Sequence, residues 1–236
     1  MFIVDKKPKS VAAESYRTLR TNIQYSSFDK EYKTIVVTSS EPAEGKTTTA
    51  GNLAIAIAQG ESKVLLIDCD MRKPSLHKRF RISNNYGLSD LLIHKKTMED
   101  VAVQYNQNLA IISAGKVPPN PSEMLGSKAM TTFLEEMKNH FDYIIMDTPP
   151  IGAVTDSQIL STKVDGTILV VKAGQTKKDV VMNSVNAIKK VNGNIIGTVL
   201  NGVEQSKNKY YYYYGTEENT AKNSKRKNRK EEVAAL

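Results

Sequence analysis

The sequence predicts one α/β domain in which a mostly parallel β-sheet is covered by helices on both faces. Short runs of apolar and β-branched residues alternate with longer helical patterns between about residues 33 and 203, which is typical of repeated βα units. The apolar runs are nearly continuous, so both faces of each strand should be buried. With 236 residues, the chain is long enough for one such domain and little more.

Each strand is expected where a run rich in Val, Ile and Leu is bounded by polar residues, glycine or proline. Such runs occupy residues 34–38, 64–68, 109–113, 143–147, 167–171 and 195–200. Between them, the spacing of the apolar residues predicts helices at residues 46–59, 127–140 and 177–191, and shorter ones at 74–80, 88–93 and 156–161. Because a helix follows most strands, successive strands should be parallel.

The segments that flank this domain differ from it. Ser10 precedes an amphipathic helix expected at residues 11–25, where a three-residue spacing sets Glu14, Arg17 and Arg20 along one face. After Gly202 the chain is rich in Lys, Asn and Glu and has no periodic apolar face, so we expect disorder. The predicted organisation is a helical region at residues 1–32, a domain at 33–203 and a tail at 204–236.

Composition excludes several classes of protein. No apolar stretch approaches the ~18 to 20 residues that cross a bilayer, and no cleavable signal is found, so we expect the chain to stay in the cytoplasm. The single cysteine, Cys69, can form neither an internal disulfide nor a multi-cysteine metal site. The formal net charge is +8, but residues 204–236 hold eight Lys or Arg against five Glu. With part of the excess in the tail and no aromatic-interleaved basic motif, nucleic-acid binding is not expected.

The first predicted strand leads through residues 39–49, Ser-Ser-Glu-Pro-Ala-Glu-Gly-Lys-Thr-Thr-Thr, directly into a helix. In a phosphate-binding loop, backbone N–H groups face the β-phosphate, a lysine bridges the β- and γ-phosphates, and a hydroxyl binds Mg²⁺. The residues predicted to bind nucleotide here are Glu44, Gly45, Lys46, Thr47 and Thr48. Two positions where glycine is usual hold Ser40 and Ala43, and a Gly-Lys-Thr tripeptide alone can simply begin a helix.

Carboxylates end two other predicted strands. Asp68 and Asp70 lie two residues apart at the end of the second strand, and Asp147 ends the strand at residues 143–147. A lone aspartate at such a place is usually a cap of a turn or a helix. The carboxyl ends of parallel strands share the sheet edge where open α/β sheets bind ligands, and residues i and i+2 share a face. Three strand ends that converge there predict a nucleotide site with Mg²⁺ ligands.

These motifs together resemble those of the bacterial tyrosine kinases that govern capsule and exopolysaccharide synthesis, a P-loop NTPase-like family. The resemblance rests on the phosphate loop, on residues 67–74 and 147–150, and on both flanks of the chain. It implies that the protein transfers the γ-phosphoryl group of ATP to tyrosine hydroxyls. The acceptors would be tyrosines of another copy of the same chain, phosphorylated in trans, and tyrosines of other proteins. It also implies a homo-oligomeric ring with an interface at Glu14, Arg17 and Arg20. The implied autophosphorylation sites are Tyr210, Tyr211, Tyr212, Tyr213 and Tyr214.

The resemblance implies a role for each catalytic residue. Lys46 would contact the β- and γ-phosphates, Thr47 would bind Mg²⁺, and Asp70 and Asp147 would hold Mg²⁺ or its waters. Asp68 would polarise the incoming phenol, whose pKa near 10 allows a nearby carboxylate to accept its proton late. No membrane span is expected, so the resemblance points to the form of the family that depends on a separate transmembrane adaptor. This adaptor would activate the kinase and recruit it to the inner face of the membrane.

Other interpretations of the same residues are open. On spacing alone, Glu14, Arg17 and Arg20 fit a solvated helix face better than an interface, and a tyrosine run in isolation is most simply a low-complexity tract. A partitioning or division-site ATPase shares the Walker architecture but has an early lysine in the phosphate loop, where Ser39 and Ser40 stand here. An iron–sulfur carrier of the same superfamily would need a cysteine pair.

Overall fold

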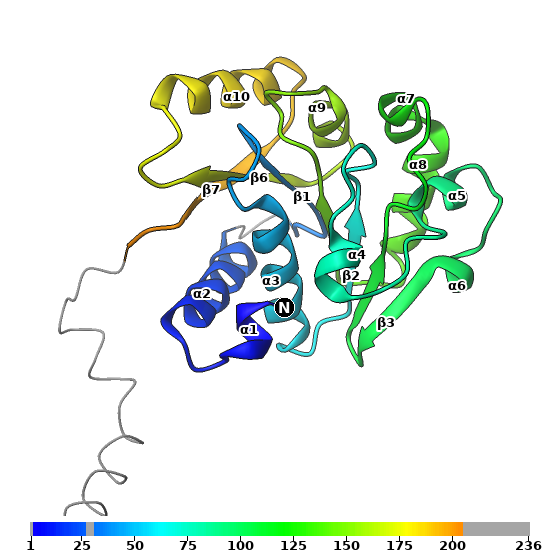
Figure 1. The fold of residues 1–236 in the computed structure, drawn as a ribbon, viewed down its shortest axis with the longest axis horizontal. Coiled ribbons are helices and arrows are strands. Elements are labelled where there is room, and N and C mark those ends of the chain that lie inside the picture. Colours follow the sequence, from blue (N-terminus) through cyan, green and yellow to red (C-terminus); the bar gives the residue numbers. More distant parts are fainter. Residues whose placement is uncertain (1, 27–30, 205–236) are drawn as a thin grey trace, which may run out of the picture. The chain divides into compact units, whose positions relative to one another are not determined.

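The computed structural model describes residues 2–26 and 31–204. At its centre is a seven-stranded sheet in the order β3-β4-β2-β5-β1-β6-β7, in which β3 is antiparallel to β4 and the other pairs are parallel (Figure 1). The strands are β1 (Thr34–Ser39), β2 (Val64–Asp68), β3 (Ala102–Asn106), β4 (Leu109–Ile112), β5 (Tyr143–Asp147), β6 (Gly166–Lys172) and β7 (Ile195–Asn201). The predicted fold class is confirmed.

Helices connect the strands and lie on both faces of the sheet. They are α1 (Ile3–Lys6), α2 (Val11–Tyr25), α3 (Lys46–Ala58), α4 (Leu76–Phe80), α5 (Leu88–Leu92), α6 (Met98–Val101), α7 (Pro121–Gly126), α8 (Lys128–Met137), α9 (Asp156–Ser161) and α10 (Lys178–Lys190). The helix α2 begins as predicted, because the hydroxyl of Ser10 accepts a hydrogen bond of 3.2 Å from the backbone N–H of Ala13.

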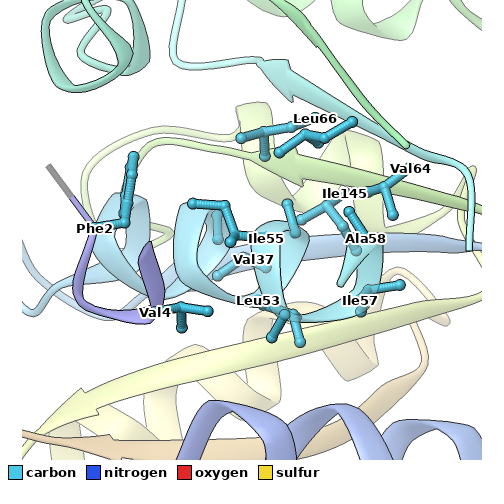
Figure 2. Packing of buried hydrophobic residues seen from close by; sticks show 14 of the residues in the cluster. Phe2, Val4, Val37, Leu53, Ile55, Ile57, Ala58, Val64, Leu66 and Ile145 are labelled. Atoms are coloured by element: carbon cyan, nitrogen blue, oxygen red, sulfur yellow. The ribbon is translucent and has the colours of Figure 1, made fainter. Parts of the chain in front are cut away.

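The core has two hydrophobic clusters, one on each face of the sheet, because successive strand residues point to opposite sides. In β1, Ile35 and Val37 belong to the cluster with α1 to α4, whereas Val36 belongs to the cluster with α5 to α9. Figure 2 shows Leu53 and Ile57 of α3 packed in the first cluster. The helix that follows the phosphate loop is thus fixed along nearly its whole length.

The register of the central strands sets the carboxylates at one level of the sheet. Asp68 of β2 is paired with Asp147 of β5, and Asp147 is paired with Val37 of β1. The strand β1 ends two residues later, at Ser39, where the phosphate loop begins. Three segments that are far apart in the sequence therefore end at the same edge of the sheet, as predicted from the parallel direction of the strands.

The predicted strands are present, with ends that differ by at most one residue from those observed, and the predicted helices agree within three residues. Four elements were not predicted, namely α1, β3, α6 and α7. The strand β3 lies at the sheet edge with most of its residues exposed, so its sequence contains no buried apolar run. The three helices have only four to six residues each, too few for an apolar periodicity.

Within the described ranges, no helix is long and apolar enough to cross a membrane. The contacts divide the chain into a unit at Met1–Gly202 and a unit at Val203–Leu236. The predicted disorder of the tail and its tyrosines concerns residues that lie outside the described ranges. The division into three regions, with a boundary near residue 33, stays a prediction.

Candidate nucleotide-binding site

The phosphate loop between β1 and α3 is shaped by two residues with positive φ. Gly45, which precedes α3, has φ of 99°, and Ala43 has φ of 65°. Glycine takes such angles without steric cost, so the alanine keeps the loop shape at a position where glycine is usual. The predicted binding residues Lys46, Thr47 and Thr48 form the first turn of α3, whose N-terminus is suited to bind an anion.

Neighbouring segments hold this loop in place through Glu44. The buried Glu44 carboxylate accepts hydrogen bonds from the hydroxyl of Thr176 and, at 2.8 Å, from the backbone N–H of Glu41. Its carbonyl accepts a hydrogen bond of 2.8 Å from the side chain of Asn201 at the end of β7. A Cβ on Gly45 would lie 2.0 Å from that Asn201 nitrogen. The sequence indicated neither Thr176 nor Asn201, because only the sheet order brings the ends of β6 and β7 to the loop.

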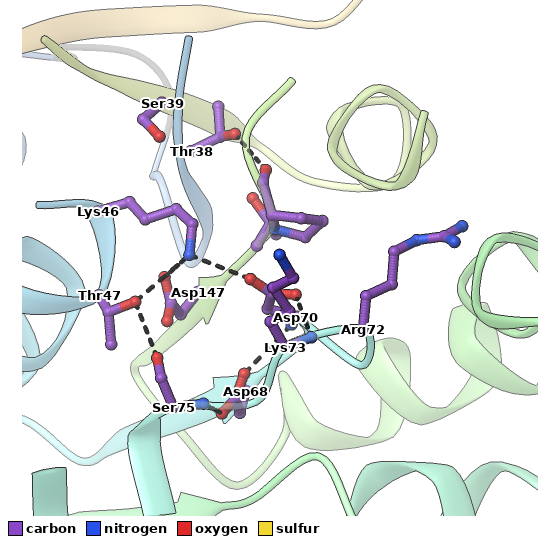
Figure 3. A network of polar contacts seen from close by, with 12 residues as sticks. Thr38, Ser39, Lys46, Thr47, Asp68, Asp70, Arg72, Lys73, Ser75 and Asp147 are labelled. Atoms are coloured by element: carbon purple, nitrogen blue, oxygen red, sulfur yellow. Dashed lines mark hydrogen bonds and ion pairs between the residues drawn. The ribbon is translucent and has the colours of Figure 1, made fainter. Parts of the chain in front are cut away.

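The ammonium of Lys46 lies among the carboxylates of the two other strand ends (Figure 3). Its Nζ is 3.2 Å from Oδ2 of Asp70 and 4.0 Å from Oδ1 of Asp147, and it donates a 3.4 Å hydrogen bond to the hydroxyl of Thr47. Burial by itself lowers the pKa of Lys46, but Asp147 and Asp70 outweigh it and raise that pKa above its ordinary value. Lys46 is therefore protonated and positively charged at neutral pH.

Asp68 is fully buried and accepts three hydrogen bonds from backbone N–H groups. Its Oδ2 accepts bonds of 3.0 Å from Ser75 and from Leu76 at the start of α4, and its Oδ1 accepts one of 3.2 Å from Asp70. Burial and the charge of Asp147 raise the pKa of Asp68 to about 8, although the N–H donors act in the opposite sense. A carboxyl with this pKa can both bind and release a proton near neutral pH.

Of the three aspartates at the site, Asp147 has the fewest partners among the described residues. Neither of its oxygens has a hydrogen-bond partner among the described residues, although its side chain is fully buried. Burial raises the pKa of Asp147 to about 6, against the lowering effect of Lys46. Buried polar atoms are normally satisfied, so two carboxylate oxygens that lack a hydrogen-bond donor among the described residues indicate a further ligand such as a cation or its water.

The residues present fit Mg²⁺ when a nucleotide supplies further ligands. Among the described residues, no three His, Cys, Asp or Glu side chains form a metal site by themselves. Mg²⁺ commonly takes only one or two carboxylates and completes its shell with phosphate oxygens and water. The oxygen donors that could serve here are the hydroxyl of Thr47 and the carboxylates of Asp70 and Asp147 (Figure 3).

The turn that carries Asp70 is fixed on both sides. Oδ1 of Asp70 accepts a 3.0 Å bond from the backbone N–H of Lys73. Between them, Arg72 donates bonds of 2.9 and 3.1 Å to the two carboxylate oxygens of Asp156 and one of 2.8 Å to the hydroxyl of Ser122. Such bidentate pairing defines the orientation of both groups. Asp156 was not predicted, because a carboxylate at a helix start is most simply a cap.

The predicted interface residues find partners within their own chain. Nη1 of Arg17 lies 2.8 Å from Oε2 of Glu14, and its Nη2 donates a 2.8 Å bond to the carbonyl of Pro8. Nη1 of Arg20 donates a 2.9 Å bond to the carbonyl of Ala56 in the last turn of α3. The structure therefore brings Arg20 to the helix of the phosphate loop, and an interface role for the three residues is untested. The predicted phosphorylation sites, residues 210–214, lie outside the described residues.

Comparison with known proteins finds relatives across this fold. A family model described as an AAA domain matches residues 32–199. Tyrosine-protein kinase YwqD of Bacillus subtilis (strain 168) is 43% identical over 202 residues, which are 85% of each chain. Putative tyrosine-protein kinase CapB of Staphylococcus aureus is 41% identical over 87% of this chain and 90% of its own. The kinase domain of the Escherichia coli tyrosine kinase ETK superposes with a TM-score of 0.84 at 34% identity, covering 89% of this chain and 83% of that one.

More distant structures share the fold alone. Apo McdA of Cyanothece has a TM-score of 0.62 at 24% identity, covering 74% of this chain and 76% of that one. At this identity the likeness shows a common fold, and it says nothing about the reaction.

Proposed function

We propose that this chain, which belongs to the family of bacterial tyrosine-protein kinases, transfers the γ-phosphoryl group of ATP to tyrosine hydroxyls. The observation that carries the proposal is the cluster of Lys46 with the carboxylates of Asp68, Asp70 and Asp147 at the mouth of the phosphate loop. Phosphoryl transfer requires positioning of the reactants and neutralisation of charge. A lysine at the phosphate-binding position and several acidic groups on one sheet edge supply both.

Binding of ATP would use groups that the fold already orients. The backbone N–H groups of Gly45, Lys46, Thr47 and Thr48 lie at the N-terminus of α3, and Glu44 fixes the loop that precedes them. The ammonium of Lys46 is held by Asp70 near the phosphate loop, so a triphosphate would compete with this carboxylate for the same cation. Thr47, Asp70 and Asp147 would hold Mg²⁺ or its waters, and the ion would neutralise charge on the phosphate oxygens.

Asp68 would accept the proton of the incoming tyrosine. In the transfer, the phenolic oxygen forms a bond to the γ-phosphorus, the bond from that phosphorus to the bridging oxygen breaks, and ADP leaves with that oxygen. A carboxylate offers about four lone-pair positions, and the three bonds that Asp68 accepts leave one for the phenol. The ionised form of Asp68 accepts this proton, and burial, which raises the pKa of Asp68, makes its carboxylate a stronger base.

The same proposal covers the substrates and partners. The tyrosines of the cluster at residues 210–214 would be phosphorylated in trans within a homo-oligomer, followed by tyrosines of other proteins. Glu14, Arg17 and Arg20 would contribute to the interface of that oligomer; Nε of Arg20 is buried and has no hydrogen-bond partner among the described residues. A transmembrane adaptor would recruit the chain from the cytoplasm to the membrane and activate it, in the control of capsular or exopolysaccharide synthesis.

The test is incubation with labelled ATP and Mg²⁺, with and without the cytoplasmic segment of the adaptor. Three full-length proteins are compared: the parent, Lys46→Met, and a variant with Phe at residues 210–214. We expect tyrosine labelling of the parent, none of Lys46→Met, and none on the tail of the Phe variant. Labelling that survives Lys46→Met would contradict the mechanism. ATP hydrolysis without any tyrosine labelling would favour a partitioning-type ATPase.

A further inference from the structure

We propose that basic side chains on and beside α4 bind a phosphotyrosine already present on a substrate segment and thereby hold a neighbouring tyrosine at the site. The α4 basic surface, as we name it, comprises Lys73, Lys78, Arg79 and Arg81. This inference rests on the proposed function, because it concerns the tyrosine substrates of the same site. It assigns the kinase a preference for segments that already carry one phosphate.

The charge of this surface is not neutralised locally. From residue 71 to residue 89 the sequence contains five Lys or Arg and no Asp or Glu. Lys73, Lys78, Arg79 and Arg81 are all exposed, and none of them forms an ion pair with a described carboxylate. Arg72, the remaining cation of this stretch, is instead paired with Asp156. Four cations are therefore available to an anion from solution.

The helix α4 is attached directly to the site. The backbone N–H groups of Ser75 and Leu76 bind the carboxylate of Asp68, so the start of α4 cannot shift without moving that residue. Leu76 and Phe80 bury one face of the helix, which places Lys78 on the opposite, solvent-facing side. Because Asp68 occupies these two N–H groups, an anion on this surface would be bound by side chains.

The dimensions suit a segment of consecutive tyrosines. In an extended chain, side chains two residues apart point to the same side and are separated by about 7 Å. A helix of the length of α4 rises about 7.5 Å from end to end. A segment with one tyrosine at Asp68 could thus place a phosphotyrosine, two positions away, along α4. The run at residues 210–214 of a second copy of the chain offers such pairs three times.

Charge complementarity favours phosphotyrosine over an unmodified segment. Residues 204–236 hold eight Lys or Arg and five Glu, and Lys207 and Lys209 stand directly before the tyrosines, so a basic surface does not attract the unmodified tail. Each phosphotyrosine adds about −1.5 to −2 charges and three strong acceptor oxygens, which arginine and lysine clusters recognise. The surface would therefore act only after the first phosphate has been transferred.

Peptides with the sequence of residues 204–220 test the proposal by binding. One peptide is unmodified, one carries phosphotyrosine at position 212, and one has Glu there. Each is titrated, by fluorescence anisotropy, with the full chain that has Phe at residues 210–214. We expect the phosphopeptide to bind at least about tenfold more tightly than the other two. Equal binding of the phosphopeptide and the unmodified peptide would overturn the proposal, as would equal binding of the Glu peptide.

Matched charge reversals locate the effect. Lys78→Glu with Arg81→Glu should reduce phosphopeptide binding about tenfold, whereas Lys189→Glu with Lys190→Glu, in the exposed last turn of α10, should change it less than about twofold. Thermal unfolding and nucleotide binding verify that both variants are folded. An equal loss in both variants would show a general charge effect and would overturn the assignment to α4.

A kinetic measurement separates this inference from the proposed function. With the adaptor segment present, the α4 double variant should raise KM for the phosphopeptide about tenfold, leave kcat unchanged, and leave KM for the unmodified peptide unchanged. If no peptide is phosphorylated by any protein, the proposed function fails while the binding data still decide the role of α4. If all peptides are phosphorylated with one KM, the function stands and the phosphotyrosine preference is wrong.

Discussion

Two groups of charged residues in this chain have similar chemistry and very different surroundings. Lys46 forms ion pairs with Asp70 and Asp147 at a site where the three side chains are 13%, 6% and 0% exposed. Arg17 pairs with Glu14 on α2 at a shorter distance, 2.8 Å, but these side chains are 29% and 67% exposed. Distance alone would rank the surface pair first.

Burial reverses that ranking. Water screens an exposed pair, so its contribution is typically about 0 to 1 kcal/mol. Charges that have lost their water depend on each other, and removing one partner from a buried pair commonly costs about 3 to 5 kcal/mol. The comparison shows that a charged motif in a sequence does not have a fixed contribution to the free energy of unfolding. That contribution depends on how deeply the fold buries the motif.

The largest effect is expected from breaking the buried group. Lys46→Met leaves Asp147 without its nearest cation and should reduce the free energy of unfolding at pH 8 by about 3 kcal/mol. It should also lower tyrosine phosphorylation at least about a thousandfold, because the β- and γ-phosphates lose their lysine. Urea denaturation and a labelled-ATP assay measure the two losses. A stable, active variant would mean that Lys46 neither compensates the charge of these carboxylates nor binds the phosphates.

A smaller effect is expected from the backbone that presents Lys46. Gly45→Ala should destabilise the fold by about 2 kcal/mol, because its φ of 99° is unfavourable for alanine and its Cβ would displace Asn201. Gly174 is a matched control, with φ of 70° and open space around its Cβ. Gly174→Ala should cost about 1 kcal/mol and leave ATP affinity unchanged. Equal losses of stability and affinity in the two variants would refute the role of the Asn201 contact.

The pH dependence of stability tests the buried carboxylates. In the folded protein the pKa of Asp147 is raised to about 6 and that of Asp68 to about 8, above the ordinary value of 3.8. The folded state therefore binds more protons than the unfolded state, so stability falls as pH rises from about 4 to 8. Between pH 5 and 7, the decrease in the free energy of unfolding should be about 1 kcal/mol smaller in Asp147→Asn than in the parent.

Denaturation without nucleotide at several pH values measures this slope. The control is Asp179→Asn, which removes an exposed carboxylate of α10 that lies outside the site. An unchanged slope in Asp147→Asn would show that Asp147 is ionised throughout the range and would contradict its raised pKa.

The smallest effect is expected from the exposed pair. Arg17→Met should change the free energy of unfolding by less than about 1 kcal/mol, since solvent screens both partners. The same denaturation experiment as for Lys46→Met provides the measurement. A loss as large as that of Lys46→Met would remove the contrast between the two regions. Sedimentation of Arg17→Met would separately test the proposed interface, for which a lower oligomer mass is expected.

The sequence predicted most of the fold because its central strands are apolar on both faces. The strands β1, β2 and β5 are fully or almost fully buried, so their runs of Val, Ile and Leu could be recognised without knowledge of any neighbour. The exposed edge strand β3 was missed for the opposite reason. The expected parallel direction of the strands likewise predicted that Lys46, Asp68, Asp70 and Asp147 share one sheet edge.

The residues that the sequence did not indicate are those whose role depends on a partner distant in the chain. Thr176 and Asn201 support Glu44 across more than 130 residues, and Asp156 binds Arg72 across 84. Such polar residues are common in loops and at helix starts, so their types carry no signal of these contacts. Arg20 was expected at an interface and lies against α3 of its own chain.

The sequence by itself determined the fold class, the phosphate loop and which strand ends carry acidic residues, because local apolar patterns and backbone chemistry suffice for each. Only the tertiary structure decided that Asp147 lacks a hydrogen-bond partner within residues 2–26 and 31–204, that Asp68 accepts hydrogen bonds from the start of α4, and that Lys46 pairs with two carboxylates. These properties follow from burial and from distances between segments, and desolvation and Coulomb energies depend on such distances rather than on residue type.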